Sequence, residues 1–356
     1  MSPFLSGPPH AYHGYKIYDQ HALYPMNIRI QRGFVLVLTL WVLVIVAIAA
    51  GYFAERVSHS VELTQQSKQN ANAMIDMAGT RAEILYRLCT TSVSEYGLGR
   101  GNAVIGLDNR AYRGLSNTVL RLQDNRGLLN LNFADDGRLR RLLGLLDIPA
   151  EQRGHLIDTL RDFTDANDLH RLNGAEKQEY LAQNLPPPLN DDLRTPWEAR
   201  RIIGWRDSPQ LWQNERLIEL TSTSQCVGIN PDTAPAEILA TMPGISQEMA
   251  QVIITRRQLS PLTNVGQLAA TTGMPPSQFD DSINFLPSHC IRITQSTQGL
   301  PWAIQYNITL TPNSNNGPWQ TDYFSRVRTT KREESLITIP RLPPRSTALP
   351  EQSPLL

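Results

Sequence analysis

The sequence is poor in cysteine and has no net charge. Its 356 residues include three cysteines and no Cys-x-x-Cys pair, which argues against a disulfide scaffold, a zinc ribbon and a thioredoxin-type redox motif. Lysine plus arginine and aspartate plus glutamate both number 33, so no global basic field exists to hold a polyanion such as DNA. With 41% apolar residues, the chain is long enough for roughly two or three domains with a hydrophobic core.

Recognisable catalytic motifs are also lacking. The sequence has no Gly-x-Ser-x-Gly, no His-Glu-x-x-His, no P-loop and no Gly-x-Gly-x-x-Gly. Its seven histidines show no spacing that suggests a metal site. We therefore expect a protein that is not an enzyme.

One long hydrophobic run stands near the N-terminus. Residues 34–54 contain no charged side chain and are long enough to cross a hydrocarbon core of roughly 30 Å. Arg29 and Arg32 precede the run, so the positive-inside rule predicts a single-pass membrane protein with its N-terminus in the cytoplasm and its C-terminal body on the other side of the membrane. The alternative is a signal peptide cut after Ala49, but the run is longer than a signal core of about 7 to 15 residues.

The start of the hydrophobic run is similar to a type IV prepilin cleavage site. A basic residue and a glycine stand directly before an aromatic residue in Arg32-Gly33-Phe34. This resemblance implies that a prepilin peptidase cuts after Gly33 and methylates the new amino group of Phe34. Residues 1–33 are then a leader or extension removed on processing, and Met26 would give a leader of ordinary length as the start.

The hydrophobic run is expected to continue as a helix beyond the membrane. No proline occurs between Pro25 and Pro149. Helical spacing of apolar residues predicts a helix to about Ser94, stopped by glycines at 97, 99 and 101. The stripe expected to pack on a sheet is Met74, Ala78, Ala82, Leu85 and Cys89.

The remainder of the chain alternates between strand and helix patterns. Strands are predicted at 119–123, 128–132, 290–294, 302–310 and 322–329, with helical patterns between 138 and 268. The order predicts an α+β fold in which a helical domain is inserted between strands. The expected segments are the transmembrane segment at 34–54, the long helix and first part of the αβ domain at 55–130, the inserted α-domain at 131–283, the remaining strands at 284–335 and a disordered Pro-rich tail at 336–356.

The combination resembles the K-type minor pseudopilins of type II secretion systems. The resemblance rests on the Gly33-Phe34 junction, on Leu38 at the fifth mature position where most pilins have glutamate, on the 124–132 stretch, and on the block 229–239. It implies a type IV pilin-like fold with an antiparallel sheet. It also implies a non-enzymatic subunit at the pseudopilus tip, which initiates assembly with I-type and J-type minor pseudopilins and could contact secreted substrate.

An acidic run lies in the expected inserted domain. Asp158, Asp162, Asp165 and Asp168 are spaced like one helix face, which is the simplest interpretation of the run. The run does not match an EF-hand loop, because Leu169 and His170 occupy positions that need an oxygen ligand and a glycine. The K-type resemblance, however, implies calcium here, and the ligands it indicates are Asp165, Asn167, Asp168 and Glu176.

Residues 239–268 resemble a helix-hairpin-helix, a motif that in other proteins contacts DNA phosphates through backbone N–H groups. The alternative function is therefore a membrane-anchored DNA-binding protein of a competence or DNA-uptake system. Arg256 and Arg257 could contact a phosphate, but Glu237 and Glu248 weaken the local field, so nucleic acid is the less favoured partner.

Two of the three cysteines flank this region. Cys226 and Cys290 are candidates for a disulfide in an oxidising compartment, whereas Cys89 on the long helix is expected to be packed.

Overall fold

The computed structural model describes residues 32–279, 282–297, 300–328 and 338–344. The chain divides into two compact units, residues 1–65 and 66–356. Each unit is described below by itself.

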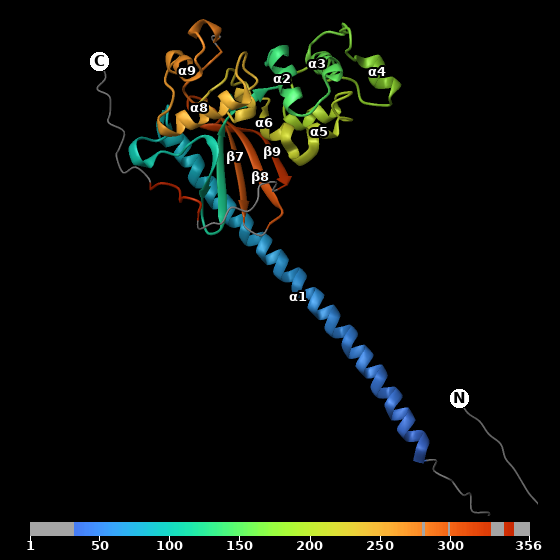
Figure 1. The fold of residues 1–356 in the computed structure, drawn as a ribbon. Helices are drawn as coiled ribbons and strands as arrows, with labels where there is room; N and C mark the ends of the chain where they lie inside the picture. Colours follow the sequence, from blue (N-terminus) through green and yellow to red (C-terminus); the bar gives the residue numbers. More distant parts are fainter. Residues whose placement is uncertain (1–31, 280–281, 298–299, 329–337, 345–356) are drawn as a thin grey trace, which may run out of the picture. The chain divides into compact units, whose positions relative to one another are not determined.

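The first described element is the helix α1 (Arg32–Thr90), shown in blue in Figure 1. Its N-terminal part contains the apolar run, and no side chain from Phe34 to Gln65 is buried. It is the one helix among the described residues that is long and apolar enough to cross a membrane. Gly33 and Phe34 both lie in its first turn.

The prediction that α1 ends near Ser94 at a group of glycines was wrong. The helix ends at Thr90, and the next residues form a small hairpin of β1 (Val93–Ser94) and β2 (Gly97–Leu98). Gly97 has a φ of +127°, which favours glycine, and a Cβ there would clash with the carbonyl oxygen of Ile105. The glycines thus shape the hairpin and the turn η1 (Gly101–Ala103) that follows α1.

The second unit is built on a five-stranded antiparallel sheet with the order β3-β4-β7-β8-β9. The sequence predicted four of these strands, and the charged edge strand β3 was missed. Their bounds are β3 (Asp108–Arg113), β4 (Thr118–Asp124), β7 (Cys290–Thr297), β8 (Trp302–Leu310) and β9 (Trp319–Arg328).

The C-terminal part of α1 packs on this sheet, but by a different face from the one predicted. The buried positions are Ala73, Met77, Thr80, Ile84 and Leu88, together with Leu85. They form one core with apolar side chains of β4, β7 and β8. Of the predicted stripe only Leu85 is buried. The predicted stripe began at Met74, whereas the buried stripe begins one position earlier and includes the polar Thr80.

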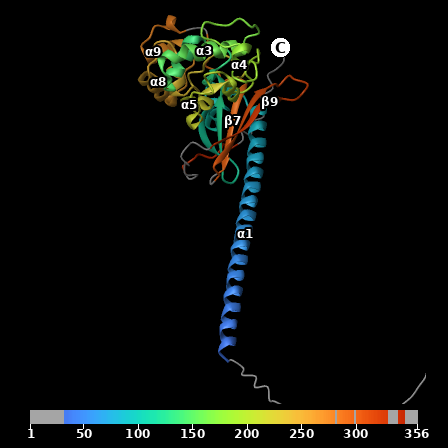
Figure 2. The same ribbon diagram turned by 90° about the vertical axis from the view of Figure 1, so that its right-hand side faces the viewer.

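The helical domain is inserted between β4 and β7, which are adjacent in the sheet (Figures 1 and 2). It has its own hydrophobic core around Trp205, Phe163 and Tyr180. Its elements are η2 (Asn125–Gly127), β5 (Leu129–Asn130), α2 (Asp136–Leu145), α3 (Ala150–Thr164), α4 (Lys177–Ala182), η3 (Pro196–Arg201), α5 (Pro209–Trp212), η4 (Gln213–Glu215), α6 (Arg216–Leu220), β6 (Thr221–Ser222), α7 (Ala236–Leu239), α8 (Gln247–Leu259), α9 (Val265–Thr272) and η5 (Pro276–Gln278). The predicted strand at 128–132 is reduced to β5, which pairs in parallel with β6.

Part of the expected disordered tail is ordered against the sheet. Residues 338–344 lie along the free edge of β3, where the Arg113 N–H donates to the Pro340 carbonyl (2.8 Å) and the Leu342 N–H donates to the Arg113 carbonyl (3.2 Å). Ile339 is buried. The tail prediction was therefore wrong for these residues, while 336–337 and 345–356 lie outside the described residues.

Candidate metal centre

Four acidic side chains lie around the loop that joins α3 to α4. Asp162 is in the last turn of α3, Asp165 ends that helix, Asp168 follows in the loop, and Glu176 precedes α4. A proline at 149 begins α3, and its apolar positions face the insert core, so the helix delivers Asp162 to the buried side of the loop. The chain then returns so that Glu176 faces the same region.

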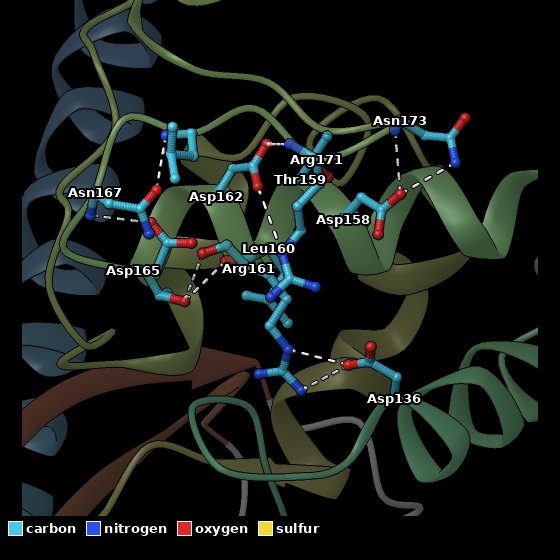
Figure 3. Close-up of polar contacts among 12 residues, drawn as sticks. Asp136, Asp158, Thr159, Leu160, Arg161, Asp162, Asp165, Asn167, Arg171 and Asn173 are labelled. Atoms are coloured by element: carbon cyan, nitrogen blue, oxygen red, sulfur yellow. Dashed lines mark hydrogen bonds and ion pairs between the residues drawn. The ribbon is translucent and has the colours of Figure 1, made fainter.

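Asp162 is the most deeply placed of these groups, with no exposed surface. Its Oδ2 accepts from the Arg171 backbone N–H at 3.1 Å (Figure 3). Its Oδ1 accepts no hydrogen bond from the described residues and has the Arg171 Nε at 3.6 Å. Gly174 approaches this carboxylate so closely that a Cβ at 174 would overlap it. Burial raises the pKa of Asp162 above its usual range.

Glu176 is buried, and neither of its carboxylate oxygens has a hydrogen-bond partner among the described residues. Burial, and after it the neighbouring charges of Asp162, Asp165 and Asp168, together raise the pKa of Glu176 to about 7. A buried carboxylate without a donor is costly, and three more acidic groups nearby make it costlier.

The predicted ligands have different surroundings in this loop. Asp165 Oδ1 accepts from the Asn167 backbone N–H at 3.2 Å, and Asp168 Oδ1 accepts from Asn190 Nδ2 at 3.1 Å. The Asn167 side chain itself accepts from the Leu169 N–H at 2.7 Å, so it shapes the loop. Asp162, which is not in the predicted ligand set, adds a buried carboxylate oxygen without a hydrogen-bond partner among the described residues to this cluster. Its position in the Asp162-Phe163-Thr164-Asp165 stretch was the available signal.

Asp158, the first aspartate of the run, has a separate task. Its Oδ2 accepts from both the backbone N–H and the side-chain amide of Asn173, each at 3.1 Å (Figure 3). The run is therefore not simply one solvated helix face. It contains a loop-fixing residue and a group of carboxylates with unsatisfied buried oxygens, and hard oxygen donors of this kind suit a calcium ion.

A second polar cluster joins the insert to the sheet, and sequence reasoning treated its central residue only as part of a turn. Asp124, at the end of β4, has no exposed surface. Its Oδ1 accepts from the Arg126 N–H and from the backbone N–H and hydroxyl of Ser288, at 3.1, 3.0 and 2.6 Å. Its Oδ2 accepts from Asn230 Nδ2 and Thr233 Oγ1, each at 3.1 Å. The carboxylate thus holds the entry and exit of the insert together with the 229–239 block.

The same joint contains a disulfide. Cys226, between β6 and α7, is bonded to Cys290, the first residue of β7. Cys89 is free and exposed on α1, so the expectation that it is packed was wrong.

In the helix-hairpin-helix segment, the residues that could contact a phosphate instead make contacts within the protein. Gly244 adopts a φ of +80°, and Ser246 caps α8 by accepting from the Met249 N–H at 3.2 Å. Arg257 Nη1 donates to the carbonyls of Pro231 and Ala234, each at 2.6 Å. Burial lowers the pKa of Arg257. Its guanidinium is therefore used in holding the domain, contrary to its predicted availability for a phosphate.

Two family models match the chain. Residues 110–213 match the model described as Type II secretion system (T2SS), protein K, and residues 224–287 match the Helix-hairpin-helix motif. No curated protein matches the chain at a significant level.

A solved structure shares the fold. It is a chain of the GspK-GspI-GspJ complex from the type 2 secretion system of enterotoxigenic Escherichia coli, with a TM-score of 0.51 and 16% sequence identity. The match covers 75% of this chain and 99% of that chain. The long helix, the antiparallel sheet and the helical insert with its hairpin motif thus form an α+β pilin-like fold, as the sequence predicted.

Proposed function

We propose that this chain is a minor pseudopilin of the type II secretion system protein K family, that it sits at the tip of the pseudopilus and that it initiates assembly of the filament. The match of residues 110–213 to the protein K model supports the proposal. The observation that carries the proposal is the family match on a pilin-like sheet interrupted by a helical domain. The role is structural: the protein promotes export of folded proteins by organising a filament.

Leu38 supports the tip position. A glutamate at the fifth mature position of a pilin is thought to pair with the amino terminus of a neighbouring subunit, because a carboxylate inside the bilayer needs a partner. Leu38 provides no such charge and is exposed on α1. A subunit without this pairing group fits best where that pairing is not required, at the end of the filament.

The partners we propose are the I-type and J-type minor pseudopilins. The similar chain was crystallised in a complex with GspI and GspJ. We also propose that a prepilin peptidase cuts between Gly33 and Phe34, and that α1 anchors the precursor in the inner membrane with the second unit in the periplasm.

Calcium is the cation we propose for the acidic cluster. Asp162, Asp165, Asp168 and Glu176 would hold it, and Asn167 would support the loop. The ion would supply the positive charge that the unpartnered oxygens of Glu176 and Asp162 need, and would fix the loop between α3 and α4.

Co-purification tests this function. The tagged full chain, co-expressed with the I-type and J-type pseudopilins and extracted in detergent, should elute with both. Its N-terminus should begin at methylated Phe34 by mass spectrometry, whereas a Gly33→Leu chain should retain the leader. A mature chain that begins at Ala50, or a chain that elutes alone, would overturn the proposal.

The helix-hairpin-helix match supports a second candidate, DNA binding. The inward position of Arg257 weakens it. Titration of duplex DNA at 50 and 200 mM salt decides the matter, since phosphate contacts should give a steep loss of affinity with salt. We expect no binding in either condition.

A further inference from the structure

Three side chains with metal-ligating atoms meet at the joint between the insert and β7. They are Cys226, His289 and Cys290, and their ligand atoms all lie within 4.8 Å of one another. The two cysteines form the disulfide, and the His289 Nε2 lies 3.4 Å from the Cys226 Sγ. Both cysteines are buried and His289 is exposed.

The separation of the His289 and Cys226 ligand atoms is that of two ligands on one tetrahedral ion. With bonds of about 2.3 Å to sulfur and about 2.0 Å to nitrogen, tetrahedral geometry places a sulfur and a nitrogen ligand about 3.5 Å apart. The His289 and Cys226 atoms already have this separation. After reduction, the two sulfurs need to lie about 3.8 Å apart, which side-chain rotation at two neighbouring cysteines can provide.

The surroundings favour a cation as well. Asp322 on β9 lies within electrostatic range of His289. Its Oδ2 accepts from Thr309 Oγ1 at 2.8 Å, and that hydroxyl lies 3.7 Å from the Cys290 Sγ. A carboxylate and a hydroxyl behind the ligands would stabilise the bound ion and orient the sulfur.

We propose that the chain, with Cys226 and Cys290 reduced, binds one thiophilic divalent cation such as zinc through these two thiolates and His289. Water would complete the coordination on the exposed side of His289. A dithiol reductant supplies two electrons and two protons to the disulfide and itself becomes a disulfide. A phosphine supplies the two electrons and becomes a phosphine oxide, while one water molecule supplies the oxygen atom and the two protons. Either reductant leaves two thiols. Binding of the cation then releases those two protons to solvent. The disulfide and the metal site are therefore alternative cross-links between the same two cysteines.

Either state would hold the same two points of the fold together. Cys226 belongs to the insert and Cys290 begins β7, at a sequence separation of 64 residues. A newly exported chain that has not yet been oxidised could thus close the joint with a metal ion. The bound ion would also protect both thiols from oxidation until it is released.

Metal content of the full chain in detergent tests this proposal. The protein is reduced with a phosphine, freed of reductant without oxygen, mixed with zinc and passed through a desalting column. The reduced chain should carry one zinc more than a Cys226→Ser, Cys290→Ser double variant, and the oxidised chain should match that variant. Cobalt in place of zinc should give thiolate charge-transfer absorption in the reduced chain alone.

His289→Ala should weaken zinc binding at least tenfold in a chelator competition, while Cys89→Ser should leave it unchanged. Zinc should also slow reformation of the disulfide in the reduced chain. Equal zinc content in the reduced and oxidised chains, or equal affinity of the wild-type and His289→Ala chains, would overturn the proposal. The oxidised chain and His289→Ala keep the test decisive even if the double variant does not fold.

Discussion

Asp124 shows how one buried side chain can organise a large insertion. A carboxylate removed from water must be fully hydrogen-bonded, and here donors from the turn after β4, from the 229–239 block and from Ser288 satisfy it. Asp124 stands beside a turn in the sequence, but three of its partners, Asn230, Thr233 and Ser288, lie more than a hundred residues away in the chain. Such a cluster cannot be found by local pattern.

Asp124→Ala should lower the free energy of unfolding of the 66–356 unit by about 3 kcal/mol or more, because it leaves buried donors unpaired. Guanidinium unfolding followed by tryptophan fluorescence measures the loss. Asp191→Asn, at an exposed position, is the control and should change stability by less than about 0.5 kcal/mol. Equal stability of Asp124→Ala and wild type would show that the cluster contributes nothing.

The effect of calcium on the melting temperature should depend on Glu176. We expect the 66–356 unit to melt at a higher temperature in millimolar calcium than in chelator, with magnesium a poor substitute, because the ion binds the native state only. Glu176→Gln should remove most of the calcium-dependent shift. In chelator it should be at least as stable as wild type, because it removes a buried charge. Glu151→Gln, exposed at the start of α3, should retain the full shift. Melting curves that coincide with calcium and with chelator would refute the site.

Asp232 should make stability depend on pH. Both of its oxygens lie 3.0 Å from the Leu262 N, and burial raises the pKa of Asp232 from 3.8 to about 6. Between these two values the native state holds a proton that the unfolded chain has released, so this contribution to stability falls as pH rises from about 4 through 6 and levels off about one pH unit above 6.

The comparison with Asp232→Asn isolates the effect. In chelator, the difference in unfolding free energy between the variant and wild type should grow by at most about 2 kcal/mol across that pH interval, in favour of the variant. Parallel pH profiles for the two chains would contradict the raised pKa.

Among the elements, those with strong periodicity were predictable from sequence. The bounds of β8 and the start of β7 agree with expectation, because their β-branched and aromatic residues alternate or form buried runs. The strand β3 was missed because its sequence, Asp-Asn-Arg-Ala-Tyr-Arg, is charged and buries only Ala111 and Tyr112. It is a strand because β4 pairs with it, which is a long-range rather than a local cause.

The C-terminal segment 338–344 belongs to the same class of missed elements. Its prolines argue against a strand, yet it covers the edge of β3 with two backbone hydrogen bonds, and Arg87 Nη1 donates to the Pro343 carbonyl at 2.7 Å. Proline is tolerated in a segment at such an edge because few of the segment's backbone N–H groups need to donate to the neighbouring strand.

Ile339→Ala should lower the free energy of unfolding by about 2 to 4 kcal/mol, since it truncates the buried side chain of this segment. Denaturant unfolding of the 66–356 unit measures the change. The exposed substitution Asp191→Asn is again the control and should change stability by less than about 0.5 kcal/mol. A variant as stable as wild type would show that the segment is only loosely held.

For the whole molecule, the sequence allowed the fold class and the place of the insertion between strands to be predicted, because each depends on a motif or a long composition pattern. The ligand set stays a prediction, because the identity of ligands depends on which oxygens the folded loop leaves without donors. The structure adds Asp162 as a candidate, since its Oδ1 has no hydrogen-bond partner among the described residues, whereas the Asn167 side chain accepts from the Leu169 N–H.

Leu38→Glu should move the subunit from the filament end into its length. The carboxylate should cost about 3 kcal/mol on membrane insertion, and it supplies the pairing group that a shaft subunit uses. Gold labelling of pseudopili should show wild type at ends and Leu38→Glu along the shaft. Leu40→Glu places the same charge two residues later and should not enter the shaft. Wild-type protein spread at every repeat would disprove the tip assignment.

The adjacency of β4 and β7 has a consequence for the order of folding. Residues 125–289 form, from the viewpoint of the sheet, one long loop between neighbouring strands. Joining strands across a flexible loop costs entropy that rises with its length, and sheets with distant partners form slowly. An insert that folds first brings its two ends together, so that pairing β4 with β7 costs about as much chain entropy as closing a short hairpin. We therefore expect the helical domain to fold first and to act as the nucleus for the sheet, so that a defect in the core of the helical domain delays folding of the whole 66–356 unit.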